Sequence, residues 1–79
     1  MSEISIAAEA GSELVRASKL HREFTSAHEG YAVILEELDE LWDEVKKREP
    51  DIEKMRHEAI QVAAMAMRFV LNVCDKKGR

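Results

Sequence analysis

Acidic residues at helical spacing on two segments are the groups in this sequence best suited to chemistry. Glu37 and Glu40 are three positions apart, and Glu58 precedes Gln61 by the same spacing. Residues three apart share a face of a helix, so two packed helices can aim such side chains at one point. Carboxylate oxygens that neighbouring Lys or Arg side chains do not neutralise attract hard divalent cations such as Mg²⁺. The pattern therefore predicts a metal site of Glu37, Glu40 and Glu58, in which Gln61 offers a neutral oxygen in place of a fourth carboxylate.

The same acids also fit an ordinary solvated helix face. Six of them lie between Glu36 and Glu44, and Lys46 and Lys47 follow as ion-pair partners. Glu58 has basic candidates of its own, which are Lys54, Arg56 and Arg16. From spacing alone, this structural interpretation is favoured over a metal site, because acid pairs three apart are common on helices.

Length and composition bound the class of protein. A chain of 79 residues allows a single domain, spanning 1–79, and buries a small share of its own surface. Yet 46% of its residues are hydrophobic, so we expect the apolar surplus to form a subunit interface in a homodimer or homotetramer. The net charge of −4 argues against binding to a nucleic acid polymer, although a divalent cation can still recruit a nucleotide.

The cysteine count and the hydropathy pattern predict a cytoplasmic protein. Cys74 is the single cysteine and cannot form an intrachain disulfide. The sequence has no recognisable signal peptide and no apolar run of membrane-spanning length, so we expect no membrane partner.

Good helix formers dominate the sequence, and the alternation typical of strands is missing. We therefore expect an all-α chain of three helices, at about 2–24, 27–48 and 51–75, that assembles into an oligomeric helical bundle. Gly11 and Ser12 interrupt the first helix, where a kink or two shorter pieces would be possible. Ser26 and Glu29 fit a capping box at the start of the second helix, and Pro50 or Asp51 opens the third.

Each predicted helix has an apolar face. In the first, the face is Ala10, Leu14, Ala17, His21 and Phe24. In the second, it is Tyr31, Ile34, Leu35, Leu38, Leu41, Trp42 and Val45. The third helix is apolar over nearly its whole circumference, with a narrow polar strip of His57, Gln61, Arg68, Asn72 and Asp75. A helix of this kind is buried on more than one side, so we expect the third helix at the centre of the oligomer.

The order of these residues resembles a known family. The segments 31–45 and 55–69, which contain Glu36-Glu37-Leu38-Asp39-Glu40 and Glu58-Ala59-Ile60-Gln61, resemble the MazG-like all-α nucleoside triphosphate pyrophosphohydrolases. That family carries an E-x-x-E pair on one helix and an E-x-x-D pair on the next. The resemblance covers over half of the chain. It implies a bundle built from two or more chains, bound Mg²⁺ (or Mn²⁺ as a substitute), and hydrolysis of a nucleoside triphosphate to a monophosphate and pyrophosphate.

Carried over by position, Glu37 and Glu40 match the first pair, and Glu58 matches the first acid of the second. Gln61 stands where the family has Asp, which implies weaker coordination of a cation. Family members usually continue into a further helix with basic and polar groups, whereas this sequence ends at Arg79.

If the chain is such an enzyme, the remaining candidates take the following roles. Glu36 or Glu44 accepts the proton of the attacking water. Arg68, and less directly Lys19 and Arg22, contact phosphate, while His28 in the first turn of its helix is a weaker candidate. Tyr31 or Trp42 contacts the base, although a large aromatic residue on a helix more often belongs to a core.

Two other functional classes are compatible with the sequence. A bundle of this kind can bind a nucleotide between subunits without hydrolysing it, which Gln61 and the short C-terminus favour. It can also be a purely structural oligomer whose acids only solvate its surface. In that third case Mg²⁺ would leave the melting temperature unchanged, since a ligand of the folded state alone must raise it.

Overall fold

The computed structural model describes residues 2–75, and these form helices without any strand. The helices are α1 (Glu3–Leu20), α2 (Ala27–Val45) and α3 (Ile52–Phe69), and α3 continues into one π-helical turn, η1 (Val70–Cys74). The expected all-α, three-helix chain is thus confirmed. None of the helices within 2–75 is long and apolar enough to cross a membrane.

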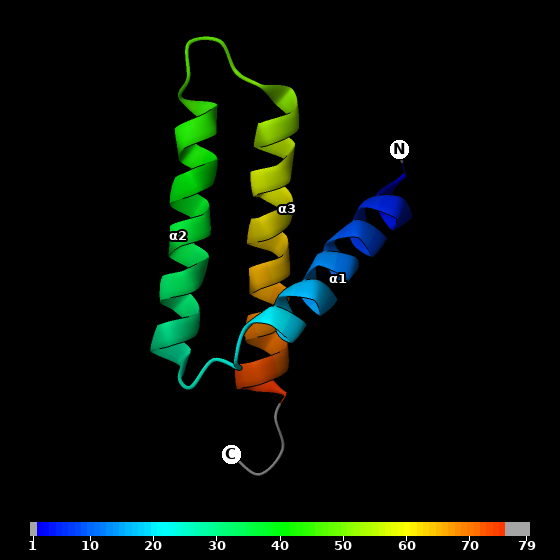
Figure 1. The fold of residues 1–79 in the computed structure, drawn as a ribbon, viewed down its shortest axis with the longest axis vertical. Coiled ribbons are helices and arrows are strands. Elements are labelled where there is room, and N and C mark those ends of the chain that lie inside the picture. The colour runs from blue at the N-terminus through cyan, green and yellow to red at the C-terminus, as the bar shows by residue number, and fades with distance from the viewer. Residues whose placement is uncertain (1, 76–79) are drawn as a thin grey trace.

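The helices α2 and α3 run antiparallel, side by side, and α1 crosses α3 obliquely near the C-terminal end of that helix (Figure 1). The N-terminal half of α1 leans away from the hairpin (Figure 1). The extents along the principal axes are 47 × 27 × 19 Å. Both other helices pack mainly on α3.

Short polar residues begin each helix. The Ser2 hydroxyl accepts the Ser5 N–H, and the Asp51 carboxylate accepts the Glu53 and Lys54 N–H groups. The Ser26 hydroxyl accepts the Glu29 N–H at 3.0 Å, as predicted for a capping box. The Glu29 carboxylate, however, accepts the Thr25 N–H at 2.8 Å, one residue before the position that a capping box would use.

The helix ends differ from the sequence-based expectation. α1 ends at Leu20 and not near Phe24, because the Phe24 N–H donates to Asn72 Oδ1 at 3.1 Å in place of a helical carbonyl. α2 ends at Val45 and not near Arg48. The last turn of the third helix is π-helical, with the Asp75 N–H donating to the Val70 carbonyl at 2.9 Å. The Gly11–Ser12 interruption does not break α1, which is one continuous helix.

The core is small and lies where the three helices meet. Ala17 of α1 packs against Ala64 and Met65 of α3, with Val33 and Ile34 of α2 partly buried beside them. Gly30 allows the closest approach, because a Cβ at that position would lie 2.6 Å from Phe69 Cδ2 and 3.0 Å from Phe24 Cδ2.

Two of the predicted apolar faces are wrong in detail within this chain. On α2, Ile34 and Leu41 are partly buried, whereas the other members of the predicted face are exposed: Tyr31, Leu35, Leu38, Trp42 and Val45. On α1, His21 is exposed, since the chain leaves the helix there. We call the five exposed residues of α2 the apolar stripe.

The polar strip of α3 points inward over part of its length. Arg68 and Asn72 are the buried polar side chains of the described residues, at 3% and 5% exposure. They are buried because the connection between α1 and α2 folds over them. In that connection, the Arg22 carbonyl accepts a hydrogen bond from Arg68, and the Phe24 N–H donates one to Asn72. The apolar residues Met67, Val70 and Leu71 are exposed instead.

Candidate metal centre and adjoining pocket

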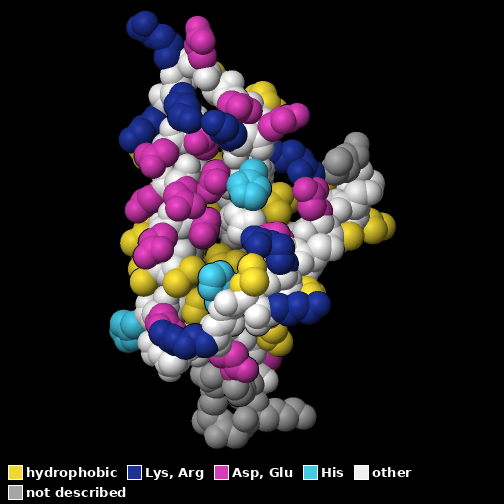
Figure 2. All heavy atoms as spheres, viewed as in Figure 1, with side chains coloured by type: hydrophobic (Ala, Val, Ile, Leu, Met, Phe, Trp, Pro, Cys, Tyr) yellow, Lys and Arg dark blue, Asp and Glu magenta, His cyan; other side chains and the backbone are white. Residues whose placement is uncertain are grey.

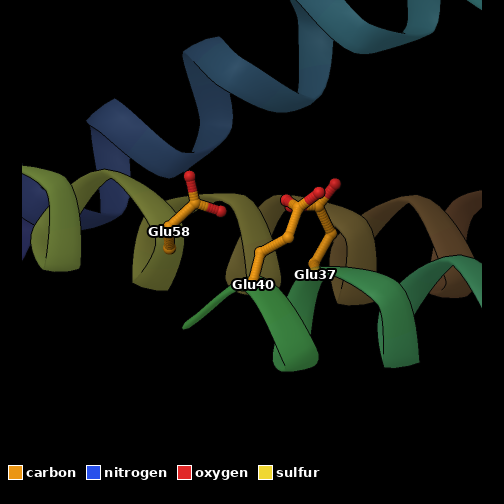
Figure 3. Close-up of side chains that lie close together, drawn as sticks. All are labelled: Glu37, Glu40 and Glu58. Atoms are coloured by element: carbon orange, nitrogen blue, oxygen red, sulfur yellow. The ribbon is translucent and has the colours of Figure 1, made fainter. Parts of the chain in front are cut away.

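Glu37 and Glu40 of α2 and Glu58 of α3 converge, as the sequence predicts. One carboxylate oxygen from each lies within 4.8 Å of the others. Figure 3 shows the Glu37 and Glu40 carboxylates together at the edge of α2, with the Glu58 carboxylate extending from α3 toward them. The antiparallel hairpin produces this arrangement, because it brings the middle of α2 level with the first half of α3. We call these residues the carboxylate trio.

Four of the five basic residues predicted as partners of these acids are paired with other carboxylates, and the fifth, Lys54, is exposed. Lys46 and Lys47 pair with Asp43 and Glu44, at 3.1 and 2.9 Å. The interpretation as a solvated ion-paired face is therefore correct for the C-terminal turns of α2.

The arginines near Glu58 are likewise paired with acids of α1. Arg56 binds Glu9, with its Nη1 donating to Oε1 at 2.7 Å, and Arg16 binds Glu13. Helix α1 thus supplies the carboxylates that take up these guanidinium groups, and it leaves the trio without them.

The pKa of Glu37 is raised to about 7. Burial is the largest cause, followed by the charge of Glu40, a hydrogen bond with it, and the charges of Glu58 and Glu36. The pKa of Glu58 is also raised, first by burial and then by hydrogen bonding to Glu40 and its charge. A hydrogen bond between two carboxyl groups requires a proton, so the trio retains protons that isolated carboxylates would lose.

One carboxylate oxygen of the trio lacks a hydrogen-bond partner. Glu58 Oε2 is buried and has no hydrogen-bond partner. A buried, unpartnered carboxylate oxygen is costly, and a hard cation relieves that cost together with the repulsion among neighbouring carboxylates. The donor set, the spacing and the orphaned oxygen therefore fit a divalent cation such as Mg²⁺ or Mn²⁺.

Gln61 lies on the α1 side of the trio. Its amide hydrogen-bonds the Glu13 carboxylate, and this bond together with the stronger one from Arg16 lowers the pKa of Glu13 to about 2. Gln61 therefore links α3 to α1, and a carboxylate in its place would repel Glu13.

A pocket of about 390 Å³ opens beside the trio, between α1 and the hairpin. Glu36 and Glu37 are among its lining residues, and we call them its acidic end; Arg22 and Arg68 also line it, and we call them its basic end, which includes Glu29 as the partner of Arg22. Its other lining residues include Arg16, Ala17, His21, Phe24, Glu29, Val33, Gln61 and Met65. On the face drawn in Figure 2, acidic side chains follow α2 and hydrophobic ones lie beside them, while Lys and Arg side chains are spread from the top of the hairpin to α1.

Arg68 is the buried cation of this pocket. Its guanidinium lies over the Phe24 ring, with Cζ 4.3 Å from the ring centroid. Its hydrogen bonds go to neutral atoms, the Arg22 carbonyl at 2.9 Å and Met65 Sδ at 3.5 Å, and its Nε has no partner. Burial lowers the pKa of Arg68.

The other predicted site residues divide into two groups. Glu36 lines the pocket next to Glu37, and Arg22 lines it while paired with Glu29 at 2.7 Å. Glu44 is paired with Lys47. The remaining candidates are exposed and are not among the residues that line this pocket: Lys19, His28, Tyr31 and Trp42.

Sequence reasoning missed the contribution of the first helix. The Glu13–Arg16 pair has the three-residue spacing of a helical ion pair, so it could have been predicted. The Arg22–Glu29 pair spans the connection between two helices, and no local spacing rule indicates it.

Comparison with family models, with curated proteins and with solved structures finds no match for this chain.

Proposed function

We propose that this chain is a Mg²⁺-dependent nucleoside triphosphate pyrophosphohydrolase of the MazG-like kind, which converts a nucleoside triphosphate to a monophosphate and pyrophosphate. The observation that carries the proposal is the convergence of three carboxylates from two helices, with no arginine or lysine paired to them in the described residues. The pKa of Glu37, raised to about 7 by burial and by its acidic neighbours, supports the same assignment.

The residues take distinct roles in this proposal. Glu37, Glu40 and Glu58 hold the cation, which would neutralise phosphate charge and orient the attacking water. Glu36 lines the pocket beside Glu37 and has its carboxylate exposed, so it accepts the proton of the water. Glu44 is the less suitable base, since Lys47 already holds its carboxylate at 2.9 Å.

The experiment is a pyrophosphate-release assay with each common nucleoside triphosphate and with Mg²⁺ or Mn²⁺. We expect release that requires the metal and that Glu58→Gln removes. Asp39→Asn is the matched control, because Asp39 is an exposed acid of the same helix outside the trio. Absence of release from every triphosphate at high protein concentration would overturn the enzymatic proposal.

A non-catalytic nucleotide-binding protein is the second candidate. The observation that favours it is Gln61, a neutral residue whose amide is bound to Glu13 and which adds no charge to the trio. Calorimetry beside the release assay separates the two candidates. Tight, metal-dependent nucleotide binding without turnover would select the binding protein.

We also propose that the protein acts as a homodimer or homotetramer. The apolar stripe supports this, because its residues follow the alternating four- and three-residue spacing of a coiled-coil seam. Leu38 and Trp42 at its centre are 47% and 58% exposed in the single chain. Light scattering should show an oligomer for the natural chain and a monomer for Leu38→Glu; a monomeric natural chain at high concentration would contradict this assembly.

A further inference from the structure

We infer that the basic end of the pocket recognises the base of the nucleotide, through hydrogen bonds from Arg68 to carbonyl oxygens. This inference depends on the proposed function for the position of the phosphates, and it names the substrate class. It predicts that the protein prefers an oxo-purine, guanine, over the amino-purine adenine.

The two ends of the pocket are separated along α3. Arg68 follows Glu58 by ten residues on α3, which corresponds to about 15 Å of helix rise. Arg68 also contacts the Arg22 carbonyl and Phe24, at the opposite end of the hairpin from the loop that joins α2 to α3. Glu58 and Arg68 therefore lie on different turns of α3, and an extended ligand that lies along the helix can contact both ends of the pocket.

A nucleotide that binds the trio through its phosphates has its base at the other end of the pocket. In an extended nucleoside triphosphate, the base is at the opposite end of the molecule from the phosphates that a metal holds. The pocket between the two ends is continuous, about 390 Å³ in volume, and partly lined by apolar side chains such as Ala17, Val33 and Met65. A pocket of this size, with apolar walls between charged groups, suits one small organic molecule.

Arg68 is a buried guanidinium with an unused hydrogen-bond donor. It is 3% exposed, its hydrogen bonds go to neutral atoms, and its Nε donor is unsatisfied. Arg16 and Arg22, by contrast, each have a carboxylate partner. A buried guanidinium with spare donor capacity is suited to an acceptor from a ligand, since buried polar groups without partners are costly.

The purine bases differ in the hydrogen-bond acceptors that they offer to an arginine. Guanine presents O6 and N7, the acceptor pair that arginine binds in a bidentate manner, whereas adenine presents an amino donor at the position of O6. Arginine against that amino group would leave a donor facing a donor. Discrimination of about tenfold or more in favour of guanine follows from one such contact.

The test uses guanosine and adenosine monophosphates with the metal chelated, so that the trio contributes nothing to binding. Calorimetry should give at least about tenfold tighter binding of the guanosine nucleotide. Arg68→Lys should reduce the preference to about onefold, since lysine cannot form the bidentate contact. Arg48→Lys is the matched control, because Arg48 is exposed and remote from the pocket lining.

A second measurement does not depend on any variant folding. In the natural chain, the Arg68 Nε–H resonance should shift on addition of guanosine monophosphate and stay unchanged with adenosine monophosphate. Equal binding of the two nucleotides, or an unmoved Arg68 resonance during binding, would overturn the inference.

The outcomes separate this inference from the proposed function. Metal-dependent pyrophosphate release without a base preference would leave the hydrolase in place and remove the role of Arg68. A guanosine preference with a shifted Arg68 resonance but no release would retain the base-binding pocket and remove the hydrolase.

Discussion

The glutamates of this protein fall into two groups with opposite behaviour. On α1 and at the start of α2, Glu9, Glu13 and Glu29 each bind an arginine, and the pKa of each is lowered, to about 2 for Glu13 and Glu29. In the trio, the pKa values of Glu37 and Glu58 are raised by burial and by neighbouring acids. The difference between the groups is the placement of the arginines and not the type of acid.

This contrast separates glutamates that stabilise the fold from glutamates that oppose it. The paired glutamates join elements, since Glu9 links α1 to α3 and Glu29 links the first connection to α2. The trio joins like charges across α2 and α3, which opposes folding unless a proton or a cation is bound. Like charges held together by a fold are typical of sites that bind metal ions or transfer protons.

The largest expected effect comes from removing the trio. Replacing Glu37, Glu40 and Glu58 together with Gln should reduce metal-dependent pyrophosphate release by at least about 100-fold, since the cation loses its charged ligands. The triple variant should still fold, because the substitutions remove repulsion. Circular dichroism and the release assay check the two statements, and release at the natural rate would contradict the role of the trio.

The next effect concerns the close packing at the other end of the hairpin. Gly30→Ala should destabilise the fold by about 1–3 kcal/mol, since the added Cβ would lie 2.6 Å from Phe69 Cδ2. Gly11→Ala is the matched control, because nothing lies within 4 Å of its Cβ and α1 is helical there. That variant should gain about 0.5–1 kcal/mol. Chemical denaturation measures both, and equal effects would show that Gly30 is not tightly packed.

A smaller effect concerns the pH dependence of the metal-free protein. Glu37 has a higher pKa folded, about 7, than the value of 4.5 expected when unfolded. The folded state therefore binds more protons between these values, and the free energy of unfolding falls as pH rises from about 4.5 to about 7. Glu37→Gln should stabilise the protein at pH 8 by about 1–2 kcal/mol after allowance for solvent screening.

Denaturation at pH 5 and pH 8, each with and without Mg²⁺, measures this contribution. Mg²⁺ should stabilise the natural chain more at pH 8 than at pH 5, where Glu37 holds a proton that competes with the cation. A stabilisation by Mg²⁺ that is equal at both pH values would show that the metal binds elsewhere.

The smallest effect comes from the paired glutamates. The pKa of Glu13 is lowered, so its contribution is present above the unfolded value of 4.5 and is lost as pH falls toward about 2. Because Arg16 is largely exposed, Glu13→Gln should cost only about 0.5 kcal/mol at pH 7. Thermal denaturation measures it, and a loss as large as that of Gly30→Ala would contradict the ranking of the two regions.

The sequence was sufficient to predict the three helices, and the convergence of the trio was predicted from residue spacing together with the family resemblance, since spacing alone favoured an ordinary solvated face. Periodicity identifies the helices, and three-residue spacing on two adjacent helices limits where Glu37, Glu40 and Glu58 can point. The early end of α1 could not be predicted, because it depends on Asn72, which is distant in sequence and bonds Phe24. The buried position of Arg68 depends on the same connection folding over α3.

The measurement that tests the central claim most directly is a calorimetric titration with Mn²⁺ at pH 8, on the natural chain and on the variant with Gln at positions 37, 40 and 58. We predict binding of about one ion per chain that the triple variant loses and that Asp39→Asn retains. Equal Mn²⁺ binding by the natural chain and the triple variant would contradict the assignment of the trio as a metal centre.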